Sequence, residues 1–389
     1  MIRLMEKSFF KNEETKEALI EFIRNTDRFS MGQQCAEFET AFAKWQGRKY
    51  AVFVSSGSMA NLVLIQSLLN SGKLQKGDKV GFSAVTWPTN VMPLLQLGLE
   101  PVPLDCELDT LNTSSAQLVE LLSHTDLKAF FITNVLGFAD DIDTIANICR
   151  ERGILLIEDN CESIGTKLND TKLGNFGLAS TFSTFIGHHL STIEGGVVCT
   201  DDEDLYHHLL MCRAHGWDRN LPEQYKNDLR SKNDVDDFYS LYTFYELAYN
   251  ARPTEIQGFL GNHQIQYLDQ MIGQRHLNFE ELNAAVINAG AIGINSSHLS
   301  LVSNFSIPVV FKESDRFETV RDLFVKNGVE IRPIIAGNIL NQPFYKKQDL
   351  PLSRLPNAEI IHGNGFYFAN RPDLTNQDKD LLIKILSQA

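Results

Sequence analysis

The sequence lacks the paired cysteines, the long apolar run and the basic excess that several classes of protein need. Its six cysteines include no CxxC pair, which argues against a zinc site or a disulfide framework and favours buried, reduced thiols. No stretch approaches the roughly 18 uninterrupted apolar residues of a membrane-spanning helix, and the N-terminus has no apolar core of signal-peptide length. We therefore expect a cytoplasmic chain without a bound metal.

Basic residues are also in deficit. Lysine and arginine number 35 against 49 aspartates and glutamates, which gives a net charge of −14. Nucleic-acid binding needs a basic surface, so this class of partner is disfavoured. Small phosphate-bearing ligands are not excluded, because a few backbone amides and one or two arginines suffice to bind them.

What the sequence does have is a regular alternation of strands and helices. The 389 residues, 43% hydrophobic and 22% charged, predict two or three folded units. Apolar runs too short for helices alternate with helical patterns, and this indicates a parallel sheet covered by helices on both faces. The predicted strands lie at 51–57, 79–84, 101–105, 129–135, 154–160, 180–185 and 195–201.

The second half of the chain differs from the first. A polar stretch over 215–245 is long enough for a functional loop or lid. Residues 252–288 then carry one long helical pattern with a predicted break at Gly261. The tail, with predicted strands near 305–311 and 329–334, shows the mixed pattern of a smaller α+β unit. We expect residues 1–250 to form a large ligand-binding α/β domain with an N-terminal helical arm, and residues 251–389 to form a bridging helix and a small C-terminal α+β domain.

Ligands of open parallel sheets bind beyond the carboxyl ends of the strands, and the first such end carries the sequence SSGSMAN at 55–61. Here a turn of small residues leads directly into a helix. Free amides at Gly57, Ser58 and Met59 would suit a phosphate, which the helix dipole also favours. The alternative is an ordinary strand-to-helix turn capped by Ser58.

Two further strand ends carry unusual side chains. Asp159 and Glu162 close an apolar strand, where a carboxylate is costly unless it meets a cation or a donor. The alternative is a helix cap formed by Asp159 with Glu162 at the third position. Trp87 follows another strand and offers a flat face for stacking an aromatic ring, although it could equally belong to the core.

The fourth strand end is the segment 181–196, which combines Ser183, the adjacent His188 and His189, and a Glu-Gly-Gly turn. An isolated pair of histidines is usually part of a solvated loop. The placement of this pair between two predicted strands favours a functional role for it.

Together these segments resemble the sugar aminotransferase-like family of enzymes that use pyridoxal 5'-phosphate (PLP). The resemblance runs from about Phe29 to the C-terminus and includes a further motif, YNARPTEIQ. It implies the type I, aspartate-aminotransferase-like fold: a mainly parallel seven-stranded sheet between helices, with a smaller α+β C-terminal domain. It also implies a homodimer with shared active sites.

The resemblance assigns a role to each motif. By this resemblance, the cofactor phosphate is bound by Gly57, Ser58, Met59 and Ser183. The cofactor ring stacks on Trp87, its pyridine nitrogen pairs with Asp159, and its ring hydroxyl contacts Glu162. It further implies that Asn250 reaches the phosphate of the partner subunit's cofactor. Met59 departs from the pattern, because related sequences usually have threonine there, and this costs one side-chain donor to the phosphate.

A second departure concerns the reaction itself. Family members carry, five residues after the serine, the lysine that binds PLP covalently, and this chain has His188 at that position. No lysine occurs between residues 175 and 225 that could replace it. We therefore expect PLP or pyridoxamine 5'-phosphate to be held noncovalently, with the imidazole of His188 as the catalytic base.

This exchange resembles the lysine-to-histidine branch of the family, the 3-dehydratases of 3,6-dideoxysugar and O-antigen lipopolysaccharide biosynthesis. Such enzymes remove the carbon-3 hydroxyl of a nucleotide-linked 4-keto-6-deoxyhexose with L-glutamate as amino donor, and the resemblance favours GDP as the nucleotide. A sister group with an iron-sulfur cluster carries cysteines where residues 215–234 have none, so no cluster is expected.

Three further residues are candidates for substrate contacts. His215 is a second pocket candidate, and Arg219 and Arg332 suit a sugar diphosphate because guanidinium groups bind phosphate bidentately. Surface positions are an equal alternative for both arginines. Two other functions remain open: an aminotransferase that makes an amino sugar, and a noncatalytic regulator that binds PLP or a nucleotide sugar.

Overall fold

The seven apolar runs of the first 200 residues form one central sheet. In the computed structural model, which describes residues 1–351 and 353–388, the strand order is β1-β9-β8-β5-β4-β2-β3. Neighbouring strands are parallel except at β9, which is antiparallel to both β1 and β8. The predicted mostly parallel seven-stranded sheet is confirmed. Its strands are β1 (Tyr50–Val54), β2 (Lys79–Ser83), β3 (Glu100–Leu104), β4 (Ala129–Thr133), β5 (Leu155–Asp159), β8 (Ala179–Ser183) and β9 (Gly196–Thr200).

Two small sheets complete the strands. One has the order β10-β6-β7 and the other β11-β13-β12. Periodicity predicts only β11 and β12 among these, because two- and three-residue strands carry too little pattern. Their bounds are β6 (Lys167–Leu168), β7 (Thr171–Lys172), β10 (Leu299–Leu301), β11 (Ser306–Val310), β12 (Arg332–Pro333) and β13 (Gly365–Ala369).

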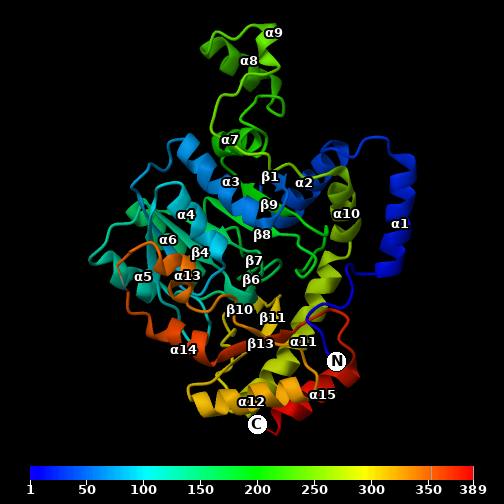
Figure 1. Cartoon of the computed structure of the whole chain (residues 1–389), viewed down its shortest axis with the longest axis vertical. Coiled ribbons are helices and arrows are strands. Elements are labelled where there is room, and N and C mark those ends of the chain that lie inside the picture. Colours follow the sequence, from blue (N-terminus) through cyan, green and yellow to red (C-terminus); the bar gives the residue numbers. More distant parts are fainter. Residues whose placement is uncertain (352, 389) are drawn as a thin grey trace.

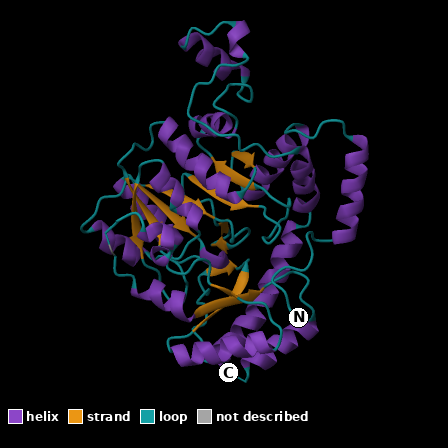
Figure 2. Ribbon diagram, in the orientation of Figure 1, coloured by secondary structure: helices purple, strands orange, loops and turns teal. Residues whose placement is uncertain are grey.

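Helices surround the central sheet, as Figure 2 shows. They are α1 (Asn12–Asn25), α2 (Gln33–Gln46), α3 (Gly57–Asn70), α4 (Met92–Gln96), α5 (Ser115–Leu122), α6 (Ile142–Arg152), α7 (Glu203–Arg213), α8 (Glu223–Lys232), α9 (Asp237–Ser240), α10 (Glu255–Ile265), α11 (Leu268–Asn288), α12 (Ser314–Lys326), α13 (Pro343–Lys346), α14 (Pro356–Asn364) and α15 (Asn376–Leu386), with short 3-10 turns η1 (Pro88–Asn90), η2 (Val135–Gly137) and η3 (Ile339–Asn341).

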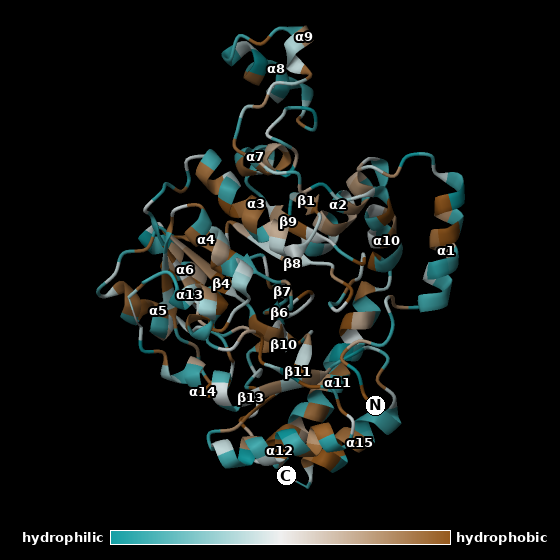
Figure 3. Ribbon diagram, in the orientation of Figure 1, coloured by the Kyte–Doolittle hydropathy of each residue, from teal (hydrophilic) through white to brown (hydrophobic). Residues whose placement is uncertain are grey.

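The core lies between the central sheet and these helices. All five residues of β4, β8 and β9 are buried, which explains why β4 and β9 are apolar runs without alternation. Figure 3 shows the hydrophobic residues gathered on the sheet strands, with hydrophilic residues along the surrounding loops.

The long helical pattern after residue 252 is two helices, α10 and α11, and the break lies at residues 266–267. The predicted break at Gly261 is therefore wrong. Gly261 lies inside α10, where an added Cβ atom would come within 2.6 Å of the Phe38 ring. The glycine lets α10 pack closely on α2 and does not end the helix.

The polar stretch predicted as a loop or lid contains two helices. Residues 215–247, called the excursion below, carry α8 and α9 and project from the rest of the chain at the top of Figure 1. Six of its large apolar side chains are more than half exposed: Phe238, Tyr239, Leu241, Tyr242, Phe244 and Leu247. The division at residue 250 into two domains stays a prediction.

Over residues 1–351 and 353–388, no helix is both long and apolar enough to cross a membrane. The same residues include no group of three or more histidine, cysteine, aspartate and glutamate side chains that could hold a metal ion. The six cysteines are free thiols.

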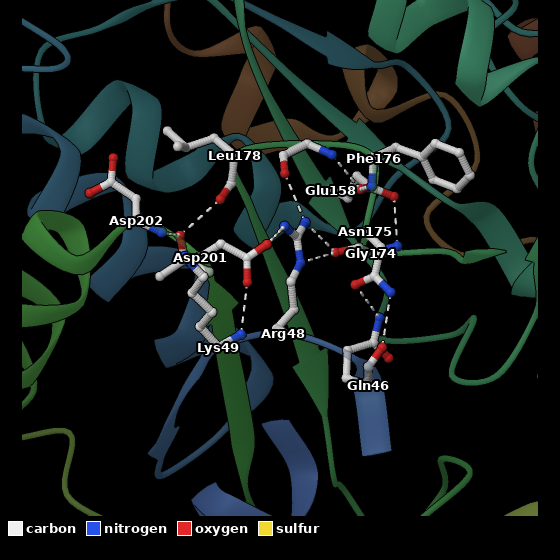
Figure 4. A network of polar contacts seen from close by, with 12 residues as sticks. Gln46, Arg48, Lys49, Glu158, Gly174, Asn175, Phe176, Leu178, Asp201 and Asp202 are labelled. Carbon is white, nitrogen blue, oxygen red and sulfur yellow. Dashed lines mark hydrogen bonds and ion pairs between the residues drawn. The ribbon is translucent and has the colours of Figure 1, made fainter. Parts of the chain in front are cut away.

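A buried polar network fixes the segment that leads into β8 (Figure 4). Glu158 on β5 is fully buried and accepts hydrogen bonds from the backbone N–H groups of Gly174 (2.7 Å), Phe176 (2.8 Å) and Gly177 (2.8 Å). Arg48 donates to the carbonyl oxygens of the same two glycines (2.7 Å each). The start of β8 is thereby tied to β5.

This network predicts a large loss of stability on truncation. The substitution Glu158→Ala leaves three buried N–H donors without an acceptor, and we expect the free energy of unfolding to fall by about 3 kcal/mol. Denaturant titration followed by circular dichroism measures this change. As a control, Glu13→Ala removes an exposed carboxylate and should change stability by less than about 0.5 kcal/mol. Equal effects of the two substitutions would contradict the role given to Glu158.

Candidate active site

A cavity of about 390 Å³ lies at the carboxyl ends of the central strands. It brings together seven of the residues singled out in the sequence: Gly57, Ser58, Trp87, Asp159, Glu162, Ser183 and His188. Side chains that the sequence analysis did not single out complete the lining: Ser56, Asn61, Thr89, Thr133, Cys161, Phe185, Glu194, Phe305, Ile335 and Tyr367. The candidate site is therefore one continuous pocket.

One end of the cavity is the N-terminus of α3. The side chain of Ser56, not of Ser58, caps this helix by accepting a hydrogen bond from the Met59 N–H (3.1 Å). That bond occupies the Met59 amide, and Met59 itself packs against the core. A Cβ atom at Gly57 would lie 2.7 Å from the Cβ of Ser183, so only glycine lets the helix start approach β8 this closely.

Asp159 lies at the end of β5 and is 4% exposed. Its Oδ2 accepts hydrogen bonds from the side-chain amides of Asn61 (3.0 Å) and Asn90 (2.7 Å), and its Oδ1 accepts from the Cys161 N–H (2.9 Å). All three donors are neutral, and no described basic residue forms an ion pair with this carboxylate. The site thus holds a buried anion that a cationic ligand atom would neutralise.

Glu162 follows three residues later without a helix between them. Residues 160–166 form turns, so the helix-cap alternative for these two carboxylates is wrong. Glu162 Oε2 accepts a hydrogen bond from the Leu136 N–H (2.8 Å). Burial, together with the smaller effect of the nearby Asp159, raises the pKa of Glu162 to about 8 against the lowering effect of the Leu136 hydrogen bond. This carboxyl group is consequently protonated near neutral pH.

His188 lies in the loop between β8 and β9. Its Nδ1 is 2.6 Å from the carbonyl oxygen of Cys161, so Nδ1 carries the hydrogen and Nε2 carries the lone pair. The ring centroid lies 5.0 Å from that of Phe305. Burial lowers the pKa of His188 to about 4, against the opposing effect of the Cys161 hydrogen bond. The imidazole is therefore a neutral base with a defined tautomer.

Aromatic rings border the cavity on two sides. Trp87 is 55% exposed at the cavity, so it is not the core residue that the alternative interpretation proposed. Phe305 and Tyr367, whose ring centroids lie 5.8 Å apart in an edge-to-face arrangement, come from the C-terminal part of the chain. Both the large and the small predicted units therefore contribute to this site.

Besides Met59 and His189, four of the singled-out residues lie outside this cavity. Asn250 is exposed, and its Oδ1 accepts a hydrogen bond from Arg252 (3.0 Å). His215 and Arg219 both contact Trp217 at the base of the excursion. Arg332 pairs with a neighbouring glutamate and lines an adjoining cavity of about 250 Å³ that shares Phe185 and Phe305 with the main one.

The site residues missed in the sequence fall into two kinds. Asn61 belongs to the quoted motif SSGSMAN, and Asn90 follows Trp87 by three residues. The ability of their side-chain amides to donate to a buried carboxylate was the available signal. Phe305, Ile335 and Tyr367 reach the cavity only through the packing of the C-terminal part, which no local pattern reports.

Comparison with known proteins agrees with this geometry. The chain is 38% identical over 370 residues to a GDP-4-keto-6-deoxy-D-mannose 3-dehydratase of Yersinia pseudotuberculosis, covering 93% of each protein. Crystal structures of a GDP-4-keto-6-deoxymannose-3-dehydratase superimpose closely. One is a variant with bound GDP-perosamine (TM-score 0.89, 34% identity, covering 99% of this chain and 100% of that one), and another holds a trapped PLP-glutamate geminal diamine (TM-score 0.88, 32% identity, covering 99% and 100%).

These likenesses confirm the predicted fold class. Residues 11–387 also match the profile of one family over nearly the whole chain. The seven-stranded sheet, the cavity at its carboxyl edge and this match lead to one assignment: the chain belongs to the DegT/DnrJ/EryC1/StrS aminotransferase family.

Proposed function

We propose that this chain is a PLP-dependent 3-dehydratase that removes the carbon-3 hydroxyl of GDP-4-keto-6-deoxy-D-mannose. The observation that carries the proposal is His188, a neutral imidazole in the cavity at the position where the family's aminotransferases have lysine. No lysine lines the described cavity. The 3-dehydratases that resemble the chain over nine-tenths of its length support the same reaction.

The cavity fits a pyridoxal-type cofactor held without a covalent bond. Gly57 and Ser58 at the start of α3 line the cavity together with Ser183, and the N-terminus of a helix favours a bound phosphate. Asp159, a buried carboxylate without a cationic partner, suits a protonated ring nitrogen. Trp87 offers a ring face, and Glu162 offers a hydrogen-bond donor to the ring hydroxyl.

The cofactor, when bound in its amino form, supplies the amino group that condenses with the carbon-4 ketone and the electron sink that expels the carbon-3 hydroxyl. His188 would take the proton from the aminomethyl carbon of the bound cofactor with Nε2, the ring atom left free by the bond to Cys161. The same imidazole would then assist departure of the carbon-3 hydroxyl as water, and hydrolysis would release ammonia and the 4-keto-3,6-dideoxy sugar. Asp159 would pair with the ring nitrogen and favour its protonated form.

Two further parts of the proposal concern the partners. L-Glutamate serves as amino donor, and its conversion to 2-oxoglutarate restores the amino form of the cofactor. The protein works as a homodimer, in which Asn250 reaches the partner subunit's cofactor phosphate and His215, Arg219 and Arg332 contact the nucleotide sugar. The exposed aromatic side chains of the excursion support an interface there, because monomers rarely expose such patches.

The reaction can be tested by following ammonia and product mass. Purified protein, PLP and glutamate should convert the GDP-linked 4-keto-6-deoxy sugar to its 4-keto-3,6-dideoxy product, and should convert the CDP-linked sugar poorly or not at all. The control variant His188→Asn removes the base and should lower turnover by at least about 100-fold, since general bases contribute 10²–10⁴. An active His188→Asn variant would disprove the assigned base.

The substitution His188→Lys tests the noncovalent cofactor. The new amine should bind PLP covalently and change its visible absorbance, while dehydration falls. The absorbance spectrum and the turnover rate of one preparation measure both effects. Dehydration at the original rate would place the base elsewhere in the cavity.

The opposed pKa shifts of the two cavity groups predict a bell-shaped pH profile. Protonation of His188 removes the base, so kcat/KM should rise as pH increases through about 4. Ionisation of Glu162 removes a donor, so kcat/KM should fall as pH increases through about 8. The variant Glu162→Gln keeps an N–H donor and should lack only the alkaline decline. A decline that survives this substitution would belong to another group.

A further inference from the structure

The second histidine of the pair has no part in the reaction described above. His189 is only 2% exposed and does not line the main cavity. Its Nε2 is 2.9 Å from the carbonyl oxygen of Ser303, so this nitrogen carries the hydrogen. The other ring nitrogen makes no hydrogen bond to a described residue. Because buried polar side chains are normally hydrogen-bonded, this single bond indicates the role of the His189 side chain.

The acceptor of that bond belongs to a firmly held segment. The Ser303 N–H donates to Thr166 Oγ1 (2.9 Å), and the Thr166 hydroxyl donates to the carbonyl of Gly137 (2.8 Å). Two residues on, the Phe305 N–H donates to the carbonyl of Leu136 (2.7 Å). Segment 303–305 is thus fixed to η2, at the carboxyl end of β4, from both of its ends.

The same segment supports the catalytic base. Phe305 packs against the His188 ring, and Ser303 accepts the bond from His189. The adjacent residues His188 and His189 therefore contact Phe305 and Ser303, which lie two residues apart on the same fixed segment. On its other side the His188 ring is held by the Cys161 carbonyl. The loop is secured at three points around the base.

We propose that His189 is a positioning residue, whose hydrogen bond to Ser303 seats the catalytic loop so that His188 stays packed against Phe305. The inference rests on the proposed role of His188 as base and adds a second required residue. Loss of the bond frees the loop to lift, and small displacements of a catalytic group cost large factors in rate.

The partial burial of His188 gives the proposal a measurable consequence. Burial is the largest cause of the lowered pKa of His188, and the charged groups that act on the histidine pair are Asp159 on β5 and Arg275 on α11. If the loop lifts, the burial effect weakens while both charges remain. The pKa of His188 then moves from about 4 toward its ordinary value of about 6.5.

The test uses three substitutions that differ in reach. In His189→Gln the amide nitrogen lies as many bonds from the backbone as Nε2, so the bond to Ser303 can re-form. In His189→Asn the amide is shorter, and in His189→Leu the donor is absent. The matched control is His298→Leu, because His298 Nε2 also meets a backbone carbonyl at 2.9 Å, that of Ala139, outside the main cavity.

Two readouts distinguish positioning from general stability. Turnover at pH 7.5 should fall by about 10-fold to 100-fold in His189→Leu and His189→Asn with little change in KM, and should return to within about threefold in His189→Gln. NMR titration of the His188 ring, without sugar, should show a raised pKa in the first two variants only. His298→Leu should leave both readouts unchanged.

Defined results would overturn the proposal. These are an unchanged kcat and His188 titration in His189→Asn, or a folded His189→Gln that is as impaired as His189→Leu. The titration needs no turnover, so it separates failure of this inference from failure of the proposed reaction. If His189→Leu does not fold, the Asn and Gln variants carry the comparison, because both keep a polar amide.

Discussion

The site depends on keeping one charge, the carboxylate of Asp159, buried at the end of β5. Burial of a carboxylate is costly, and here three neutral donors from α3, η1 and the turn after β5 offset the cost. Those donors come from segments nearly 100 residues apart, so the carboxylate is satisfied only when the strands, α3 and η1 are all in place. The buried carboxylate that would bind the ligand is therefore satisfied only in the folded chain.

Glu158, the residue before Asp159, has a separate role on the other face of the sheet. Side chains alternate along a strand, so Glu158 points away from the cavity and binds the backbone that leads into β8. β8 in turn carries Ser183 and the loop with His188. Two consecutive acidic residues of β5 thus organise the two halves of the site, one through a side chain in the cavity and one through the path of the backbone behind it.

Sequence reasoning predicted the elements whose signal is local. Buried strands such as β4 are continuous apolar runs, and the motifs at their carboxyl ends meet because parallel strands place those ends at one edge. It failed where packing decides: Gly261 allows two helices to touch, although glycine in a helical pattern suggests a break. Asn61 and Asn90 lie in segments already singled out, but their contact with Asp159 depends on the fold. Phe305 and Tyr367 reach the cavity through long-range packing, which no local pattern reports.

Because β9 runs antiparallel to β8, the loop that carries His188 has both of its ends fixed in adjacent strands. Loop 184–195 leaves β8 and re-enters the sheet at the adjacent strand, and five residue pairs on each side of β9 fix its register. Hydrogen bonds between Thr184 and Gly195 and between Ile186 and Ile193 extend the ladder into the loop. An inserted or deleted residue would have to be absorbed within this short closed loop, whereas a substitution leaves its path intact. Single substitutions in loop 184–195 can therefore change the chemistry of the site, whereas insertions and deletions in this loop would disturb the pairing of β9.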